Sequence, residues 1–281
     1  MIVVAGISEL RERIGGARTG KRRIGFVPTM GYLHEGHLTL VDYARARADV
    51  TVMSVFVNPL QFGPGEDLDR YPRDLEWDRR LAQQRGVDLL FTPSAAELYP
   101  AGPPHTRVTA PALSNRLCGA YRPGHFEGVL TVVAKLFHIV DPDVAVFGQK
   151  DLQQVVLVRR MVRDLDFAIE IVVTPIVREP DGLAMSSRNR YLDPVQRSSA
   201  RALSRALEAA QDAFTGGERA PAALVATARA SLAADAGVTE QYIEVVDPET
   251  LEAPERARPG DAVAIAAFVG ATRLIDNHLL A

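Results

Sequence analysis

Short runs of β-branched residues alternate with longer stretches of helical apolar spacing through the first two thirds of the chain. A strand buried between two layers of helices reads as a continuous apolar run. The strands that this pattern predicts are Ile24–Val27, Val50–Val57, Val87–Thr92, Val144–Phe147 and Ile169–Val173. The helices that it predicts between them are His37–Ala48, Leu75–Arg85, Gly128–Val140 and Gln153–Leu165. The pattern therefore predicts an α/β fold, a parallel sheet with helices on both faces.

The sequence has a different character after Thr174. A loop signature with proline, glycine and two serines covers Pro175–Asn189. Beyond it, helical stretches are expected at Pro194–Phe214 and Pro221–Ala234, and short strands at Tyr242–Val246, Ala262–Phe268 and Arg273–Ile275. We therefore expect a Rossmann-like domain over residues 1–176, with its ligand crevice beyond the carboxyl ends of the strands, and a smaller α+β domain over residues 177–281.

Composition narrows the class of partner. Apolar residues make up 47% of the 281 residues, which is enough to fill such domains without metal or disulfide staples. The single cysteine, Cys118, excludes an internal disulfide, suits a reducing cytoplasm and is expected to be a packing residue. No stretch approaches the roughly 18 uninterrupted apolar residues of a membrane span. The 35 acidic residues nearly balance 32 basic ones, which argues against nucleic acid as a partner. We expect a cytoplasmic protein that binds small molecules, with no membrane or nucleic-acid partner.

A turn with two histidines joins the first predicted strand to the first predicted helix. It reads Pro28-Thr29-Met30-Gly31-Tyr32-Leu33-His34-Glu35-Gly36-His37. A glycine-containing turn before a helix presents backbone N–H groups and the positive helix end to a phosphate. His34 and His37 are three residues apart, so both can donate to one anion as charge grows in a transition state. A zinc-protease motif needs histidines four apart in a continuous helix, which Gly36 is expected to interrupt, and the Gly-Lys-Ser/Thr ending of a Walker loop is absent.

Three further polar segments stand where the crevice rule places ligand contacts. Val57–Phe62 follows the second predicted strand, Gly148–Gln154 follows the fourth, and Met185–Asn189 lies in the loop between the two domains. Because all three follow or connect predicted elements at one edge of the sheet, they are candidates for a shared ligand site.

The side chains in these segments suit a nucleotide. Lys150 can place a mobile charge on triphosphate oxygens, and Asp151 can accept from ribose hydroxyls. The hydroxyls of Ser186 and Ser187 and the guanidinium of Arg188 can bind phosphate. Local sequence alone leaves open that these are ordinary polar residues of a helix start and a loop.

The H-x-G-H turn resembles the signature of the nucleotidyltransferase superfamily, whose members attack the α-phosphorus of a nucleoside triphosphate and release pyrophosphate. Six motifs together resemble the pantothenate synthetase family, the pantoate–β-alanine ligases. In chain order they are PTMGYLHEGH, FVNPLQF, LDRYPR, GHFEGV, GQKDLQQ and AMSSRNRYL, and the ending Thr272–Asn277 is also similar to that family. The resemblance implies an ATP- and Mg²⁺-dependent condensation of (R)-pantoate with β-alanine through a pantoyl-adenylate, with release of AMP and pyrophosphate, by a homodimer.

The resemblance also implies roles for single residues. His34, His37 and Lys150 would be catalytic. Gln61 and Gln154 would bind pantoate, and Gln61 would also bind β-alanine. No residue is assigned to the metal, and the C-terminal domain would act as a lid. The ATP site would be lined by Met30, Gly31, Tyr32, Leu33, His34, Glu35, Gly36, His37, Gly148, Gln149, Lys150, Asp151, Val177, Met185, Ser186, Ser187 and Arg188.

The sequence departs from the family pattern at two positions. Gln149 stands where the pattern leads us to expect glutamate, which puts a role for a carboxylate there in doubt. Trp77 interrupts an acidic stretch that ends at Asp78. Lys150 and Asp151 remain intact beside the first of these changes.

Three other functions remain open at this point. A small cytidylyl- or adenylyltransferase would release pyrophosphate but no AMP, and its phosphorylated substrate would call for more cationic residues than the neutral pair Gln61 and Gln154. A class I tRNA synthetase would need a longer chain and a basic surplus. A nucleotide-sensing binding protein on the same fold would form neither product.

Overall fold

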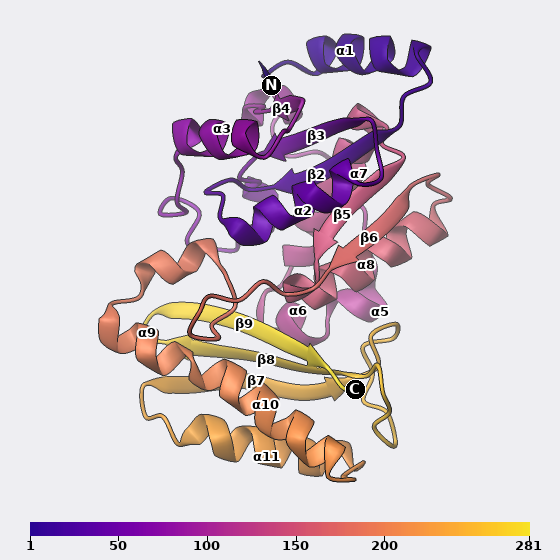
Figure 1. The fold of residues 1–281 in the computed structure, drawn as a ribbon. Helices are drawn as coiled ribbons and strands as arrows, with labels where there is room; N and C mark the ends of the chain where they lie inside the picture. Colours follow the sequence, from indigo (N-terminus) through magenta and orange to yellow (C-terminus); the bar gives the residue numbers. More distant parts are fainter. The chain divides into compact units, whose positions relative to one another are not determined.

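A parallel sheet of six strands organises the first part of the chain in the computed structural model, which describes residues 1–281 (Figure 1). The strands are β1 (Ile2–Val4), β2 (Ile24–Thr29), β3 (Val50–Val55), β4 (Leu89–Phe91), β5 (Val144–Gly148) and β6 (Glu170–Thr174). Their order is β1-β4-β3-β2-β5-β6, and every neighbouring pair is parallel. The chain moves outward from β2 to β4 on one side and from β5 to β6 on the other. The direction therefore switches between β2 and β5, where open α/β sheets bind ligands beyond the carboxyl ends of the strands.

Helices cover both faces of this sheet. The longer ones are α1 (Ile7–Thr19), α2 (Glu35–Arg45), α3 (Leu75–Gln84), α7 (His125–Val140) and α8 (Leu152–Asp164). On one face, Val27 of β2 belongs to an apolar cluster with Leu38 and Val41 of α2. On the other face, Phe26 meets Phe137 of α7 edge-on, with 6.5 Å between the ring centroids. Because Phe26 and Val27 are neighbours in one strand, their side chains point to opposite faces, and the predicted covering of both faces is confirmed.

Short helical segments occupy several connections. They are η1 (Pro59–Gln61), α4 (Ala95–Leu98), α5 (Pro111–Ser114), α6 (Leu117–Tyr121) and η2 (Gln149–Asp151). The tight turn η2 leads directly into α8, so the segment after β5 begins as a 3₁₀ helix before the regular helix starts. None of the helices combines the length and the hydropathy that crossing a membrane requires.

An antiparallel sheet and three helices form the C-terminal part, as predicted for a small α+β domain. The strands β7 (Val238–Val246), β8 (Ala262–Val269) and β9 (Thr272–Leu279) are neighbours in that order. The remaining elements are η3 (Ser187–Tyr191), α9 (Pro194–Ala200), α10 (Ala202–Thr215) and α11 (Pro221–Ala233). Val263 and Ile265 of β8 share one apolar core with Leu203 and Leu207 of α10 and Leu224 of α11. In Figure 1, α10 and α11 accordingly lie along one face of this sheet.

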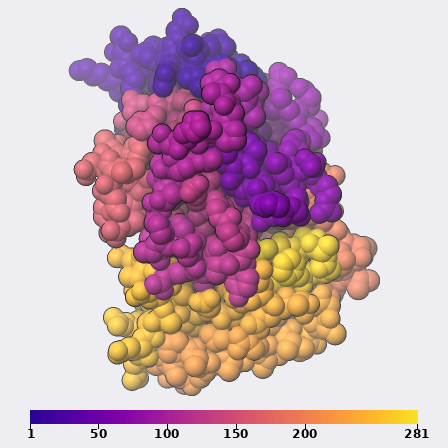
Figure 2. All heavy atoms as spheres, turned by 180° about the vertical axis from the view of Figure 1, so that it is seen from behind, coloured from indigo at the N-terminus to yellow at the C-terminus, as the bar shows by residue number.

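Contacts within the chain divide it into two compact units. The first unit comprises residues 1–114, 119–148 and 157–175, and the second comprises residues 115–118, 149–156 and 176–281. The second unit therefore contains η2 and the first residues of α8 as well as the antiparallel sheet. The connection between β4 and α7, magenta in Figure 2, forms much of the surface of the first unit on that side.

The first strand and the first helix were not predicted. A strand of three residues, β1, is too short to show a periodic pattern, yet it pairs with β4 at the edge of the sheet. Helix α1 contains Gly15 and Gly16, which are poor helix formers, and it buries only Leu10 and Ile14. Tertiary contacts hold both elements, so local propensity gave little sign of them.

Several predicted boundaries also need correction. Helix α2 begins at Glu35 and not at His37, so Gly36 lies inside the helix and does not interrupt it. The stretch Pro194–Phe214 forms two helices, α9 and α10, and Arg201 is the one residue between them. Strand β3 ends at Val55 because Asn58 and Pro59 begin η1 soon afterwards.

Candidate active site

The turn between β2 and α2 has an unusual backbone. Gly31 and the non-glycine residue Tyr32 are both left-handed, with φ of +84° and +52°. A Cβ atom at Gly31 would lie 2.7 Å from Oδ2 of Asp78 and 2.7 Å from Cγ1 of Val55. Only glycine fits this position, because it accepts the positive φ and lets the chain approach both side chains. The sharp turn thus brings the backbone against the end of β3 and against α3.

The side chain of Asp78, in α3, is hydrogen-bonded to the backbone of this turn. Its carboxylate accepts hydrogen bonds from the N–H groups of Tyr32 (3.0 Å) and Leu33 (2.7 Å). The indole N–H of the adjacent Trp77 donates to the carbonyl of Leu33 at 3.0 Å. The Asp78 residue is 1% exposed, and burial raises the pKa of its carboxyl while the two backbone donors work in the opposite direction. Trp77, which departs from the family pattern, and Asp78, which ends the same acidic stretch, therefore both support the turn, a role that the sequence did not reveal.

The two histidines lie together where α2 begins. His34 precedes the first residue of the helix, and His37 lies in the first turn. Their ring centroids are 4.1 Å apart, and the N–H of His34 donates to Nδ1 of His37 at 3.4 Å. An Nδ1 atom that accepts leaves the proton of the neutral His37 ring on Nε2. Although α2 is continuous through Gly36, a spacing of three residues still fails the zinc-protease pattern.

Gln61, a predicted pantoate-binding residue, contacts the predicted nucleotide-binding turn. It ends η1, is buried, and donates from Nε2 to Sδ of Met30 at 3.1 Å. Its Oε1 atom accepts from Nδ2 of Asn58 at 3.2 Å. Thioether sulfur is a weak acceptor, so the Gln61 amide can exchange this contact for a stronger one with a ligand oxygen. The structure thus brings Met30 and Gln61 together in the first unit.

Asn58, a buried residue that we did not predict as functional, organises this region. Its Nδ2 atom also donates to the carbonyl of Gly128 at 3.1 Å, and its Oδ1 atom accepts from the hydroxyl of Tyr99 at 2.9 Å. Burial raises the pKa of Tyr99 to about 12, so the hydroxyl keeps its proton and donates. The local sign in the sequence is Asn58 followed by Pro59, because an asparagine side chain caps a helical turn whose first residue is proline.

The motif Gly124–Val129, at the start of α7, packs against the same segment, η1. A Cβ atom at Gly128 would lie 2.3 Å from the carbonyl oxygen of Leu60, so α7 and η1 can meet only at a glycine. His125 contacts the carbonyl of Gln61 through Nδ1 (2.8 Å) and Arg122 through Nε2 (3.0 Å). Because a guanidinium only donates, Nε2 of His125 accepts and Nδ1 donates to the carbonyl. The backbone carbonyl of Gln61 is thus held more firmly than its side-chain amide.

The cationic group beside this segment is neutralised. Arg122 forms two hydrogen bonds of 2.6 Å to the carboxylate of Glu66. Burial acts to raise the pKa of Glu66, but the bonds and charge of Arg122 outweigh it and lower that pKa, so the pair stays ionised. An arginine satisfied in this way is a poor receptor for a phosphorylated substrate.

In the second unit, the segment after β5 carries the predicted lysine. Gly148 ends β5, and Gln149, Lys150 and Asp151 form η2. The ammonium of Lys150 lies 4.0 Å from the carboxylate of Asp151. Asn277 of β9 donates from Nδ2 to the carbonyls of Gln149 and Lys150, at 3.0 Å each, and its Oδ1 atom accepts from Nε2 of Gln149 at 3.1 Å. The sequence identified Asn277 only as part of the ending Thr272–Asn277 that is similar to the family. No residue near Asn277 in the sequence indicates its contacts with η2.

The loop predicted to carry the phosphate-binding residues forms a narrow hairpin after β6 and then the turn η3, which holds those residues. Arg178 and Ala184 form an antiparallel bridge, and the N–H of Met185 donates to the carbonyl of Val177 at 3.0 Å. The predicted residues Val177 and Met185 are therefore paired across its base. Beyond them, Ser186 caps η3 by accepting from the N–H of Arg188 at 3.3 Å, and Ser187 begins that turn.

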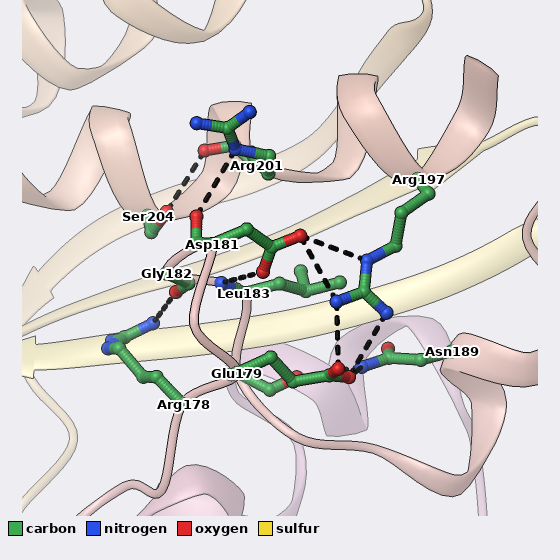
Figure 3. A network of polar contacts seen from close by, with 10 residues as sticks. Arg178, Glu179, Asp181, Gly182, Leu183, Asn189, Arg197, Arg201 and Ser204 are labelled. Atoms are coloured by element: carbon green, nitrogen blue, oxygen red, sulfur yellow. Dashed lines mark hydrogen bonds and ion pairs between the residues drawn. The ribbon is translucent and has the colours of Figure 1, made fainter. Parts of the chain in front are cut away.

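Ionised side chains hold this hairpin in place (Figure 3). Arg197 of α9 bonds to Glu179 at 2.8 Å and to Asp181 at 3.1 Å. The amide of Asn189 donates to Glu179 at 3.0 Å and to the carbonyl of Ala184 at 3.1 Å. The hydrogen bonds from Arg197 lower the pKa of Glu179, so the pair is ionised at neutral pH. Arg197 is 18 and 16 residues from its two carboxylate partners, a separation that no periodic sequence pattern expresses, so these contacts were not predicted.

Two other predicted residues have simple positions. Gln154 is half-buried in α8. Cys118 is buried, lies 3.1 Å from the hydroxyl of Tyr242 and accepts from Arg273 at 3.3 Å, as suits a packing residue. No group of three or more His, Cys, Asp or Glu side chains is arranged to hold a metal ion.

Comparison with known proteins gives consistent results. The family described as pantoate–β-alanine ligase matches residues 2–279. Pantothenate synthetase 1 of Bradyrhizobium diazoefficiens is 54% identical over 281 residues, which cover 100% of this chain and 98% of that protein. The crystal structure of pantothenate synthetase from Thermus thermophilus matches with a TM-score of 0.94 and 49% identity, over 99% of both chains. The pantoate–β-alanine ligase of Francisella tularensis, complexed with beta-gamma ATP and β-alanine, matches with a TM-score of 0.83 and 35% identity, over 99% of this chain and 97% of that one.

Proposed function

Since the chain belongs to the pantoate–β-alanine ligase family and is a ligase, we propose that it condenses (R)-pantoate with β-alanine through a pantoyl-adenylate. ATP would supply the adenylyl group, and AMP and pyrophosphate would be released. The observation that carries this proposal is the turn after β2, which stands at the switch point of the sheet and places His34 and His37 at a helix N-terminus. Backbone N–H groups and the helix dipole favour a phosphate there.

The proposed ATP site is built from segments that end or follow β2 and β5. These strands are neighbours in the sheet, so Met30–His37 and Gly148 lie at the same edge, and Gln149–Asp151 follow directly in the chain. The crevice rule supports this location. Val177 and Met185–Arg188 would close on the phosphates, because the hairpin leads into a capped turn that contains the hydroxyls of Ser186 and Ser187 and the guanidinium of Arg188.

In the first proposed step, a carboxylate oxygen of pantoate attacks the α-phosphorus, and the bond from that phosphorus to the bridging oxygen of pyrophosphate breaks. Negative charge grows on the phosphoryl oxygens and the leaving group. His34, His37 and Lys150 would stabilise this charge from fixed positions, which is the usual origin of large rate effects in such reactions. Because Nδ1 of His37 accepts from the backbone, the proton of the neutral ring lies on Nε2, the atom that would donate to this charge.

In the second step, the neutral amine of β-alanine attacks the activated carbonyl carbon. The carbon–nitrogen bond of the amide forms, the bond from that carbon to the AMP oxygen breaks, and the amine nitrogen loses a proton. The acyl-adenylate reacts readily with water, so the site has to close over it. We assign this closing role to the C-terminal unit with its hairpin.

Pantoate would be oriented by Gln61 and Gln154, and β-alanine would also contact Gln61. Glutamine amides can donate to and accept from the hydroxyl groups of pantoate without drawing charge from its carboxylate, as an arginine clamp would. The fixed peptide of Gln61 and its weak contact with Met30 support this assignment, since the amide is oriented in advance and readily changes partner.

Magnesium fits this proposal as a companion of the triphosphate, because the chain offers no cluster of acidic or imidazole ligands for it. When bound, it would neutralise charge on the phosphates, in the manner usual for magnesium held mainly by a nucleotide. We also propose a cytoplasmic location, which the buried thiol of Cys118 suits, and a homodimer, which sedimentation equilibrium tests.

One incubation tests the proposed reaction. The protein is mixed with ATP, magnesium, pantoate and β-alanine, and the expected products are AMP, pyrophosphate and pantothenate in equal amounts. Omitting pantoate should abolish all three. ADP with inorganic phosphate would contradict attack at the α-phosphorus. Pyrophosphate without AMP would indicate a nucleotidyltransferase, and no product at all would indicate a nucleotide sensor.

A further inference from the structure

A buried asparagine in the last strand is bonded to the turn that carries the proposed catalytic lysine. Asn277 is 2% exposed and donates from Nδ2 to the carbonyls of both Gln149 and Lys150, at 3.0 Å each. Its Oδ1 atom accepts from the amide of Gln149 at 3.1 Å. One side chain therefore satisfies three polar groups of two consecutive residues. All of these atoms belong to the second unit.

The position of the Lys150 ammonium depends on how firmly the backbone of residue 150 is held. Its side chain is a flexible four-carbon stem, and the carboxylate of Asp151 lies 4.0 Å from the ammonium, which is too far for a strong hydrogen bond. The side chain is thus not locked by its own contacts. The place that the ammonium can reach is set by the position and direction of the backbone at residue 150, and the amide of Asn277 fixes that backbone.

The strand itself is anchored beside this contact. The carboxylate of Asp276 forms two hydrogen bonds with Arg178, at 2.6 and 3.0 Å, and its Oδ1 atom also accepts from the N–H of Asn277 at 2.8 Å. Arg178 in turn donates to the carbonyl of Gly182 in the hairpin at 3.0 Å. Two adjacent residues of β9 therefore hold the lysine turn and the base of the hairpin to one strand.

We propose that Asn277 is a positioning residue for Lys150, which directs the ammonium of that lysine onto the phosphates of ATP. This inference rests on the proposed function, in which Lys150 stabilises the charge of the adenylation transition state. The alternative is that Asn277 only satisfies buried carbonyls and stabilises the fold. The two roles differ in one measurable respect. A positioning residue loses its effect on the rate when the lysine is absent, whereas a structural residue keeps it.

A double-mutant cycle makes this distinction. Single-turnover formation of the adenylate is measured at saturating ATP for the wild type, Asn277→Asp, Lys150→Ala and the double variant. Asn277→Asp keeps the size of the side chain but removes both donors. We expect it to lower the rate by roughly 10- to 100-fold, the scale of a misplaced reacting group. In the Lys150→Ala background, the same substitution should lower the rate by less than about threefold.

Gln211→Ala provides the matched control. The amide of Gln211 also bonds to two backbone groups, the N–H and the carbonyl of Ala281 shortly after β9, but it has no contact with η2. It should leave the adenylation rate within about twofold of the wild type. Thermal unfolding of every variant shows whether the fold is kept. Should Asn277→Asp not fold, Asn277→Ser keeps one short donor, and its smaller loss of rate should disappear in the same way without Lys150.

Three results would overturn the inference. An equal loss of rate with and without Lys150 would make Asn277 a structural residue. A wild-type rate in a folded Asn277→Asp would remove it from catalysis altogether. A wild-type rate in Lys150→Ala would remove the inference together with the proposed role of the lysine, and this result is recognised from the single variant alone. The first of these results, found together with a large loss of rate in Lys150→Ala, would overturn only the role of Asn277 and leave the proposed role of the lysine in place.

Discussion

The two segments proposed to contact the phosphates are held by different means. The turn after β2 is held by its backbone, through two left-handed residues and the buried carboxylate of Asp78. The hairpin between β6 and η3 is held by ionised side chains, since Arg197 pairs with Glu179 and Asp181, and all three are about a quarter to a third exposed. A buried backbone lock suits an element that must not move. Partly exposed ion pairs suit an element that can shift, because water can replace them at little cost.

The same difference sets opposite responses to acid. Burial raises the pKa of Asp78, so its ionised form costs stability at neutral pH and protonation relieves that cost. The hydrogen bonds from Arg197 lower the pKa of Glu179, so its ionised form stabilises the hairpin until acid removes the charge. Acidification should therefore loosen the hairpin and spare the turn.

The largest expected effect is the loss of a donor from the turn. His37→Ala should lower the rate of adenylate formation by roughly 10²–10³, or about 2.7–4 kcal/mol, the scale for removing one fixed transition-state donor. Quenched-flow measurement of the first turnover checks this. Thr39→Ala, which alters a hydroxyl bonded to the carbonyl of Glu35 in the same helix, is the matched control and should leave the rate nearly unchanged. A normal first turnover in His37→Ala would assign this histidine to structure.

A smaller effect is expected from loosening the backbone lock. In Asp78→Asn, one backbone N–H faces an amide N–H in place of an acceptor, which should cost about 1–3 kcal/mol of unfolding free energy. The displaced turn should lower the adenylation rate by roughly 10- to 100-fold. Denaturant unfolding and single-turnover kinetics measure the two effects.

Asp74→Ala is the control that separates a loss of stability in α3 from a displacement of the turn. Asp74 caps α3 by accepting from the N–H of Trp77 and makes no hydrogen bond to the turn itself, so its loss should cost about 1 kcal/mol while both bonds from the turn to Asp78 remain. We expect a comparable loss of stability with at most a few-fold change in rate. Equal losses of rate in Asp74→Ala and Asp78→Asn would mean that Asp78 matters only through the stability of α3.

The hairpin should respond in binding more than in chemistry. Arg197→Met removes both ion pairs, and a loss of up to about 1 kcal/mol corresponds to roughly a fivefold rise in the KM for ATP. The kcat value should change less, and hydrogen exchange at Met185–Arg188 should become faster. Arg229→Met, which breaks a surface pair with Glu240, is the control. A fall in kcat with an unchanged KM would show that the hairpin is part of the rigid machinery.

The smallest effect is on the pH dependence of stability. Because the folded pKa of Glu179 lies below its ordinary value of 4.5, its ion pair contributes fully above that value and is lost as pH falls through the folded pKa. The unfolding free energies of the wild type and Glu179→Gln should differ by no more than about 1 kcal/mol at pH 7. Chemical denaturation between pH 7 and pH 3 should show this difference disappearing at the acidic end. A difference that grew with acid would contradict the assignment.

The sequence predicted local features well and distant partners poorly. The strand-to-helix turn, the polar segments after the strands and the change of character after Thr174 are all continuous in the sequence, so composition and spacing can express them. The supports of the site are not continuous. Tyr32 and Asp78 are 46 residues apart, and Lys150 and Asn277 are 127 apart. A buried carboxylate or amide reveals its role only when the fold brings its partner to it.

The interleaved make-up of the two compact units has a consequence for how this protein can be divided. The second unit takes residues 115–118 and 149–156 from the middle of the chain. A gene fragment that began at residue 176 would therefore encode Asn277 without Gln149 and Lys150, and Tyr242 without Cys118. Such a fragment would lack polar partners that its own interior requires. The two units cannot be exchanged between relatives as cassettes with a single junction, and chimaeras need matched sequence at all three segments of the second unit.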